Sequence, residues 1–455
     1  MGYQKIPVKL LQERAARYFD RTEKELRPRL FPFSPLIFLA TVVATSGVFA
    51  TFPNAEPTGL ALFLQNSLKT APILIRPILW LLAPLFVAAL EWYVVLFGIR
   101  QVIRFVLSYN GWLYETFATM SLKTKAWMMF IKVLNKLSTG FFSFRDVIPA
   151  LPLPPVEQTV EKYLKSVRPW MSEEEHDKEV RLSETFLEKE ASGLQWRLRL
   201  KWLTSANYVT DWWNEFIYMR HRKSLLYSTT HSVDTPFNQP TTIQAARAAN
   251  TILCTLDWEQ EIFFDQTLKP ITLGGIPLCP MQYPRLCRTL RRAGVETDSL
   301  VHLSEDASHV AIYCRGCWYR LETVADGRRF TAAELERTVQ QMIDRTPDPS
   351  PGEERLAALT ADNRPQWAKN REKFFSKQAN SLNHDSITAV EQARLILFLD
   401  DEDRCYDKAR EDFRKFDRHC ARTLHGDGYL LWCDKPHAIH VSRNGRVSEN
   451  AEHGW

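Results

Sequence analysis

Two long uncharged stretches dominate the hydrophobic pattern of the N-terminal part of the chain. Leu36 to Phe52 contains 17 residues without a charge, and Pro77 to Ile99 contains 23 residues with Glu91 as its single carboxylate. Because roughly 20 apolar residues in a helix cross a bilayer, the pattern predicts transmembrane helices at 34–52 and 77–99. The alternatives are a cleaved signal peptide for the first stretch, and two core helices of a soluble protein.

The charges around these stretches predict their orientation. The leader 1–33 carries eight Lys and Arg residues, the connector 53–76 carries two, and Arg100 and Arg104 follow the second stretch. Since Lys and Arg concentrate on the cytosolic side of a membrane, we expect both ends of the chain on that side. A carboxylate in lipid is costly, so Glu91 is expected to face a partner helix, water or headgroups, in a packing or oligomer role.

Local patterns after the second stretch predict a body of mixed α/β class with sheets flanked by helices. A helical connector is expected at 100–147, followed after a proline-rich entry by a helix from Val156 to Val167 with apolar residues at helical spacing. Ser172-x-x-Glu175 is a capping box that predicts the start of another helix. The apolar run Leu395–Leu399 predicts a short buried strand.

Two short turn signals predict hairpins in this body. Asn444-Gly445 lies within the alternating segment His437–Ser448, and Arg315-Gly316 separates two cysteines in Cys314–Cys317. The cysteine pair could instead supply half of a zinc site, but the sequence has no second pair at the required spacing. His437 and His440 are expected on opposite faces of a strand, which disfavours a shared metal. We therefore predict no metal site.

An aromatic segment, Asn207–Arg222, places Trp213 and Ile217 on overlapping helical faces with Phe216 beside them. The spacing favours an aromatic stripe buried in a core. The alternative is a site for a quaternary ammonium ligand, because aromatic rings attract such cations through cation–π contacts.

His453 is the strongest candidate for chemistry, because it follows the predicted hairpin and so has a stiff support. An imidazole can accept a proton near neutral pH, which suits a general base acting on a hydroxyl or thiol. The alternative is a surface histidine without a chemical role.

Composition adds two limits. The chain of 455 residues has 58 basic and 53 acidic residues, for a net charge of +5, and no long block of one sign. Charge therefore gives no reason to expect a nucleic-acid partner. Eight scattered cysteines fit reduced thiols in a cytosol-facing protein.

Several blocks of sequence, taken together and in this order, resemble the choline/carnitine acyltransferase family. Their similarity covers the chain from about the first apolar stretch to the last residue. The blocks are Ser108–Trp112, Ile148–Pro169, Asn207–Arg222, Gln244–Thr251, Pro351–Glu353, Leu356–Thr360 and Asn450–His453.

The resemblance implies a two-lobed, chloramphenicol-acetyltransferase-like fold, with 148–455 as an incomplete N-terminal lobe. It implies transfer of a long-chain acyl group between coenzyme A and carnitine, both as substrates, without a tightly bound cofactor. His453 matches the family's catalytic base, and Trp213 and Tyr218 match aromatic positions on the carnitine side. With the two apolar stretches, the resemblance extends to members anchored in the mitochondrial outer membrane, so 53–76 would be an intermembrane-space loop and the two helices could support a homo-oligomer.

The sequence also departs from the family pattern. Leu431–Pro436 differs from the family's Arg-Trp-Phe-Asp-Lys-Ser, and the carboxylate that the family places four residues after its histidine would lie past Trp455. The coenzyme A lysines and the carnitine-binding arginine would lie further on. We therefore expect no turnover from this chain alone, and the alternative to an enzyme is a membrane-anchored binding or scaffold protein.

Overall fold

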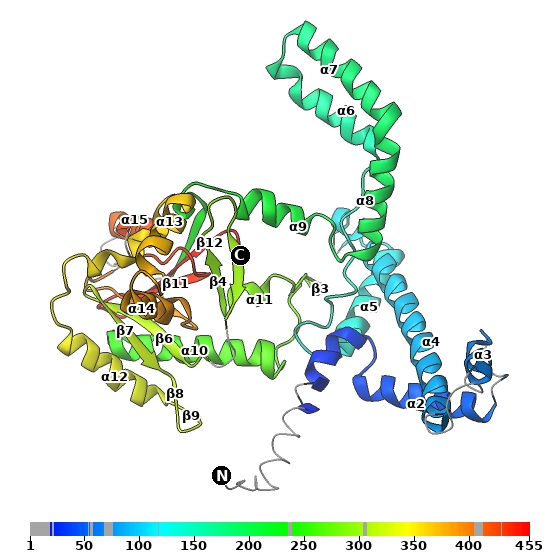
Figure 1. Cartoon of the computed structure of the whole chain (residues 1–455), viewed down its shortest axis with the longest axis horizontal. Coiled ribbons are helices and arrows are strands. Elements are labelled where there is room, and N and C mark those ends of the chain that lie inside the picture. The colour runs from blue at the N-terminus through cyan, green and yellow to red at the C-terminus, as the bar shows by residue number, and fades with distance from the viewer. Residues whose placement is uncertain are drawn as a thin grey trace. The chain divides into compact units, whose positions relative to one another are not determined.

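In the computed structural model the chain forms two compact units (Figure 1). The first unit is Met1–Thr210 with Phe264–Pro280, and the second is Asp211–Phe263 with Met281–Trp455. The structure describes residues 19–20, 22–52, 54, 58–67, 76–116, 118–234, 239–303, 307–404, 413–428 and 430–455. Residues 1–18 and 21 of the predicted leader and half of the predicted connector 53–76 lie outside these ranges. The expectation that 148–455 forms one lobe stays a prediction.

Two apolar helices, α2 (Pro35–Thr51) and α4 (Arg76–Leu107), pack against each other in the first unit. The indole Nε1 of Trp92 on α4 donates a hydrogen bond to Oγ1 of Thr45 on α2, at 3.0 Å. A small apolar core between the helices is formed by Val42, Phe49, Val87 and Ala88.

Among the described residues, one helical stretch, Leu82–Tyr114, is long and apolar enough to cross a membrane. The 17-residue α2 meets the same criterion only when joined to the helix Thr22–Leu30, from which it is bent by 78°. The pairing of two spans therefore stays a prediction. The helix expected at 77–99 continues to Leu107, because its last turns carry Ile103 and Leu107 into a further apolar core with α5 (Leu122–Leu137).

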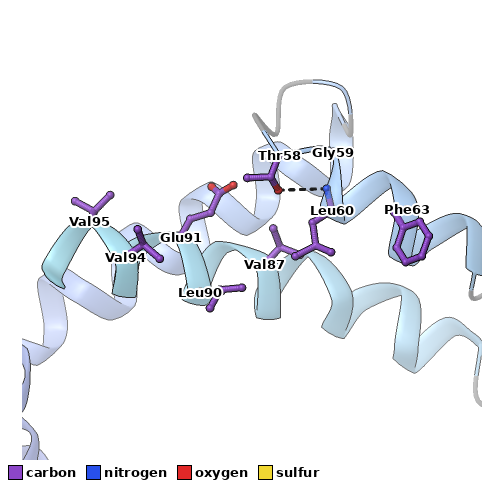
Figure 2. Close-up of a pocket in the computed structure, with 9 residues that line it drawn as sticks. All are labelled: Thr58, Gly59, Leu60, Phe63, Val87, Leu90, Glu91, Val94 and Val95. Atoms are coloured by element: carbon purple, nitrogen blue, oxygen red, sulfur yellow. Dashed lines mark hydrogen bonds between the residues drawn. The ribbon is translucent and has the colours of Figure 1, made fainter. Parts of the chain in front are cut away.

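A hollow of about 670 Å³ lies between α4 and the short helix α3 (Leu60–Ser67). Figure 2 shows that Leu90, Val94 and Val95 line it from α4, together with the carboxylate of Glu91. Thr58 is the other polar side chain in this lining, and the remaining side chains that line the hollow are apolar.

The other elements of the first unit are short helices and one small hairpin. The helix predicted from Val156 and the capping box of Ser172 and Glu175 are both confirmed. These elements are η3 (Gly111–Tyr114), α6 (Val156–Val167), η4 (Arg168–Trp170), α7 (Glu173–Phe186), η5 (Leu187–Ala191), α8 (Ser192–Thr204), β2 (Thr272–Leu273) and β3 (Ile276–Pro277).

A six-stranded mixed sheet in the order β1-β12-β11-β10-β6-β7 forms the centre of the second unit and confirms the predicted α/β class. β10 is parallel to both of its neighbours, β11 and β6, and the other three strand pairs of this sheet are antiparallel. The strands are β1 (Thr229–Val233), β6 (His309–Cys314), β7 (Cys317–Glu322), β10 (Ile396–Leu399), β11 (His437–Val441) and β12 (Val447–Glu452).

Both faces of the sheet are covered by helices, and alternate side chains of β10 enter the two cores. Leu397 and Leu399 pack towards α10 (Gln244–Glu259) and α12 (Ala332–Arg345). Ile396 and Phe398 pack on the other face, towards η9 (Glu353–Ala361), α13 (Arg364–Phe375) and α14 (Ser381–Glu391). All four side chains are buried, which confirms the predicted strand.

The remaining elements of the second unit surround this sheet. They are α9 (Thr210–Trp212), η6 (Trp213–Met219), η7 (Leu225–Ser228), η8 (Gln260–Phe264), α11 (Tyr283–Leu286), β4 (Thr289–Arg292), β5 (Ser299–His302), β8 (Val324–Ala325), β9 (Arg328–Arg329), α15 (Phe413–His425) and η11 (Gly426–Gly428).

Both predicted hairpins are confirmed. β11 and β12 are antiparallel around a turn in which Gly445 has φ 76°, and β6 and β7 are joined by Arg315 and Gly316 with φ 44° and 91°. His437 and His440 have different surroundings: His437 contacts the Glu449 carboxylate at 2.5 Å, and His440 stacks on Phe398 in the core.

Candidate active site

His453 follows the last residue of β12 directly. β12 lies between β1 and β11, and Glu452 is paired in register with Thr229 of β1. The backbone N–H of His453 donates to the carbonyl of Ser228, at 2.9 Å. The backbone of His453 is therefore fixed by the sheet, while its side chain is exposed.

Tyr218 contacts the ring of His453 from the π-helix η6. The Tyr218 hydroxyl lies 3.3 Å from Nδ1 of His453, and the two ring centroids are 6.2 Å apart. The wider turn of η6 is visible in the hydrogen bond from the N–H of Arg220 to the carbonyl of Glu215, five residues back, at 2.8 Å. Trp213 lies at the other end of η6 with half of its surface exposed. Of the three predicted site residues, the structure thus brings Tyr218 and His453 together.

The contact with Tyr218 restricts the chemistry of the imidazole. If Nδ1 carries the proton, it donates to the Tyr218 oxygen and leaves Nε2 unprotonated and able to act as a base. In the other tautomer, the Tyr218 hydroxyl donates to Nδ1, and Nε2 carries the proton. The arrangement suits general-base chemistry at Nε2 in the first tautomer.

The aromatic residues around Trp213 are not a buried core stripe, so the interpretation favoured by their spacing is wrong. The side chains of Trp212, Trp213, Phe216 and Ile217 are 45%, 51%, 60% and 49% exposed. The spacing argument assumed 3.6 residues per turn, whereas this segment is π-helical and its side chains follow a wider turn. These rings are thus exposed, and the guanidinium of Arg220 lies over the ring of Phe216, 5.5 Å from its centroid.

Glu452, the residue before His453, is buried and fully bonded. Its Oε1 accepts from the Ser228 hydroxyl at 2.6 Å, and its Oε2 accepts from the Gly454 N–H at 2.8 Å and from Arg291 Nη1 at 3.2 Å. Arg291 also donates through Nη2 to the carbonyl of Tyr218, at 2.6 Å. One buried guanidinium on β4 therefore connects the chain on both sides of the Tyr218–His453 contact.

The ion pairs continue from Arg291 into the core. Asp298 accepts from Arg291 Nε at 2.9 Å and from Arg364 Nε at 2.8 Å, and Arg364 Nη1 lies 2.7 Å from the Asp434 carboxylate. Burial opposes the charge of Arg364, but the attraction of Asp434 and Asp298 outweighs it and holds the pKa of Arg364 above its ordinary value. Trp367 completes the partners of Asp434 through its indole N–H, at 2.7 Å.

Sequence reasoning missed this buried network. Its local signal is the run of polar residues at alternate positions of β12, Ser448, Asn450 and Glu452, all of which are buried. Alternation alone predicts that such residues face solvent, because it does not reveal which face the sheet covers. Among the described residues, the structure contains no group of three or more His, Cys, Asp or Glu side chains placed to hold a metal ion.

The amino-acid sequence of this chain is similar to those of known proteins over most of its length. Residues 151–455 match the family described as choline/carnitine O-acyltransferase. The chain is 34% identical over 442 residues to carnitine O-palmitoyltransferase 1, liver isoform, of Homo sapiens, which covers 96% of this chain and 56% of that protein. It is 34% identical over 430 residues to the human muscle isoform, covering 94% and 55%, respectively.

A more distant relative is the peroxisomal carnitine O-octanoyltransferase of Bos taurus, 28% identical over 338 residues, which cover 69% of this chain and 51% of that protein. The chain thus spans about half the length of each of these relatives. With the family match over residues 151–455, the chain belongs to the choline/carnitine O-acyltransferase family.

Proposed function

We propose that the chain is the membrane-anchored, histidine-bearing part of a carnitine O-palmitoyltransferase that transfers long-chain acyl groups from acyl-CoA to carnitine for mitochondrial fatty-acid oxidation. The observation that carries the proposal is the contact of His453 with Tyr218 at a fixed strand end. It is supported by 34% identity over 442 residues to a protein of that name. Acyl-CoA and carnitine are the proposed substrates, without a tightly bound cofactor.

His453 is the proposed general base. Its Nε2 removes the proton from the carnitine hydroxyl while that oxygen attacks the thioester carbonyl. The new ester C–O bond forms, the C–S bond breaks, and the imidazolium returns the proton to the thiolate of coenzyme A. Tyr218 supports this step by accepting the Nδ1–H hydrogen bond, which keeps Nε2 free. The exposed ring of Trp213 is suited to the trimethylammonium group of carnitine through a cation–π contact.

We further propose that α2 and α4 anchor the chain in the mitochondrial outer membrane, with both termini in the cytosol. The support is the length of α4, its packing against α2, and the many exposed apolar side chains on both helices. Arg100 and Arg104 follow the apolar run on the proposed cytosolic side. Glu91 and the hollow beside α3 are a candidate contact for a homo-oligomer.

The test is palmitoyl transfer from palmitoyl-CoA to carnitine, measured in membranes for the 455-residue chain and, in parallel, for the complete product of its gene. Removal of a general base lowers the rate by roughly 10²- to 10⁴-fold, so His453→Ala should abolish most of the transfer. His437→Ala, at the start of the neighbouring strand, is the matched control and should retain it. Equal activity of the His453→Ala variant and the unmodified protein would remove His453 from this role.

The rival function is a binding or scaffold protein that holds acyl-CoA or carnitine without turnover. Calorimetry with carnitine and palmitoyl-CoA separates the two. Binding without transfer by either form of the protein would favour the scaffold, and transfer that depends on His453 would favour the enzyme.

A further inference from the structure

α5 presents one apolar and basic face to the surroundings. Thr124, Trp127, Ile131 and Leu134 are its buried residues and mark the opposite side of the helix. The exposed apolar residues are Leu122, Met129, Val133 and Leu137, at 83%, 69%, 52% and 49% exposure. The exposed lysines are Lys123, Lys125, Lys132 and Lys136, and the helix contains no Asp or Glu.

The lysines and the apolar residues form two adjacent rows. Lys125, Lys132 and Lys136 follow one another at intervals of about two turns and one turn, and Met129 and Val133 follow along the neighbouring line. A helix with apolar side chains bordered by lysines is typical of segments that lie at the boundary between acyl chains and headgroups. The long lysine side chains can extend from such a depth to the phosphates.

The position of α5 places this face next to the proposed span. Its N-terminal half is held at the end of α4, where Trp127 Nε1 donates to the carbonyl of Val106 at 2.7 Å and Tyr109 bonds to Thr124 at 2.6 Å. Its C-terminal half lies further back along α4, beside Val95. Lys132 and Lys136 are therefore near the level where the apolar run of α4 ends.

A cavity of about 580 Å³ lies between the two helices at that level. Its walls are apolar, with Val95, Gly98 and Val102 from α4 and Val133 and Leu137 from α5. The cavity borders the lysine row through Val133 and Leu137, so it can take part of an acyl chain whose headgroup reaches the lysines.

The small hairpin of β2 and β3 supports the same surface independently. Asn135 on α5 donates through its side chain to the carbonyl of Gly275 in the hairpin turn, at 2.7 Å. Leu273, the last residue of β2, is 70% exposed, and Lys269 precedes the hairpin and is also exposed. An exposed leucine next to a hairpin turn, with an exposed lysine before it in the chain, repeats the apolar and basic character of α5.

We propose that the exposed face of α5 binds the anionic phospholipid headgroups of the bilayer that α4 enters. This inference rests on the proposed membrane anchor and adds to it a specific lipid class and the residues that select it. The lysine row contacts the phosphates, and the apolar row and the cavity receive the adjoining acyl chains. α5 thereby fixes the depth and tilt of the end of α4 in the membrane.

The test uses the full chain in nanodiscs of phosphatidylcholine alone, or of phosphatidylcholine with phosphatidylglycerol. Brief acylation of lysine amines is quantified by mass spectrometry. An anionic surface attracts each nearby lysine enough to reduce its free population about fivefold, so Lys132 and Lys136 should react about fivefold more slowly in the anionic discs. Lys162 and Lys178, exposed on α6 and α7, are internal controls and should react equally in both.

A matched pair of variants gives a second measurement. Lys132→Gln with Lys136→Gln should lower the phosphatidylglycerol that co-purifies with the protein several-fold, and Lys162→Gln with Lys178→Gln should leave it unchanged. Equal reaction rates in the two kinds of disc would overturn the inference. If Lys132 and Lys136 reacted as slowly in detergent without lipid as in the anionic discs, the inference would also be overturned. A second copy or another protein would then cover the face.

Resistance to an alkaline carbonate wash separates this inference from the proposed anchor. A chain that resists the wash but shows no protection at Lys132 and Lys136 would retain the anchor and refute the role of α5. A chain released by the wash would refute both.

Discussion

Replacement of Arg291 by Met is the sharpest test of the buried network behind the candidate active site. The substitution keeps much of the side-chain volume and removes the guanidinium that joins Glu452, Asp298 and the Tyr218 carbonyl. Two buried carboxylates then lose a charged partner. The neighbouring strand β12 and the π-helix η6 lose their common contact.

The size of the effect follows from what each carboxylate retains. Removing one partner of a buried ion pair costs about 3 to 5 kcal/mol. Asp298 keeps Arg364, and Glu452 keeps the Ser228 hydroxyl and the Gly454 N–H. We therefore expect a loss near the lower end, about 3 kcal/mol in the opening free energy of the second unit.

The control is Arg320→Met. Arg320 contacts Glu322 at 2.6 Å, but these side chains are 57% and 41% exposed. An exposed pair of this kind contributes about 0 to 1 kcal/mol. The same chemical change thus has two expected magnitudes that differ only because of burial.

Hydrogen exchange of peptides from β11 and β12 measures the opening free energy of the second unit apart from the first. A double-mutant cycle of Arg291→Met with Glu452→Gln should give a coupling of about 1 to 3 kcal/mol. If Arg291→Met costs no more than Arg320→Met, the reasoning from burial is refuted.

Three further predictions concern pH, the turn before β12, and Tyr218. Burial lowers the pKa of Lys435 to about 7. Between pH 7 and the ordinary lysine pKa, the unfolded chain binds the Lys435 proton and the folded chain does not, so the free energy of unfolding rises with pH. The slope should exceed that of the Lys435→Met variant by about 1.4 kcal/mol per pH unit. Parallel urea-unfolding profiles of the two proteins against pH would contradict this. A Cβ on Gly445, at φ 76°, would lie 2.4 Å from a backbone oxygen, whereas Gly327 has the same φ and open space around it. Gly327→Ala should lower the free energy of unfolding by about 1 to 2 kcal/mol, and Gly445→Ala should lower it clearly more. Equal melting temperatures of the two variants would argue against this turn geometry. Tyr218→Phe removes one hydrogen bond to His453 and should slow palmitoyl transfer by about two- to tenfold, and an unchanged rate would exclude the proposed support of the imidazole.

Local sequence signals predicted much of the fold. The capping box at Ser172, the Asn444-Gly445 turn and the apolar run before Asp400 act over a few residues, so their structural consequences could be predicted without the rest of the chain. The position of His453 at the end of a strand followed from the second of these signals. These predictions succeeded because the energy of a turn or a cap depends mainly on neighbouring residues.

Long-range partners could not be predicted in the same way. Arg291 and Glu452 are separated by 161 positions, and their attraction depends on burial that the folded chain creates. The aromatic segment failed for another reason: Trp213 and Ile217 share a face at 3.6 residues per turn, but the chain adopts a π-helix there. A single wider turn is too small a change for periodicity to detect.

That π-helix has a consequence for how the chain tolerates changes in length. Each residue advances a helix by about 100°, so the removal of one residue from η6 with its wide turn retained would rotate one flank relative to the other by about that angle. Tyr218, held on one side by Arg291, could then no longer keep both its carbonyl contact and its hydroxyl beside His453. The number of residues between Trp213 and Met219 thus determines the direction of the Tyr218 side chain. A one-residue deletion there should lower activity more than most substitutions in the same segment.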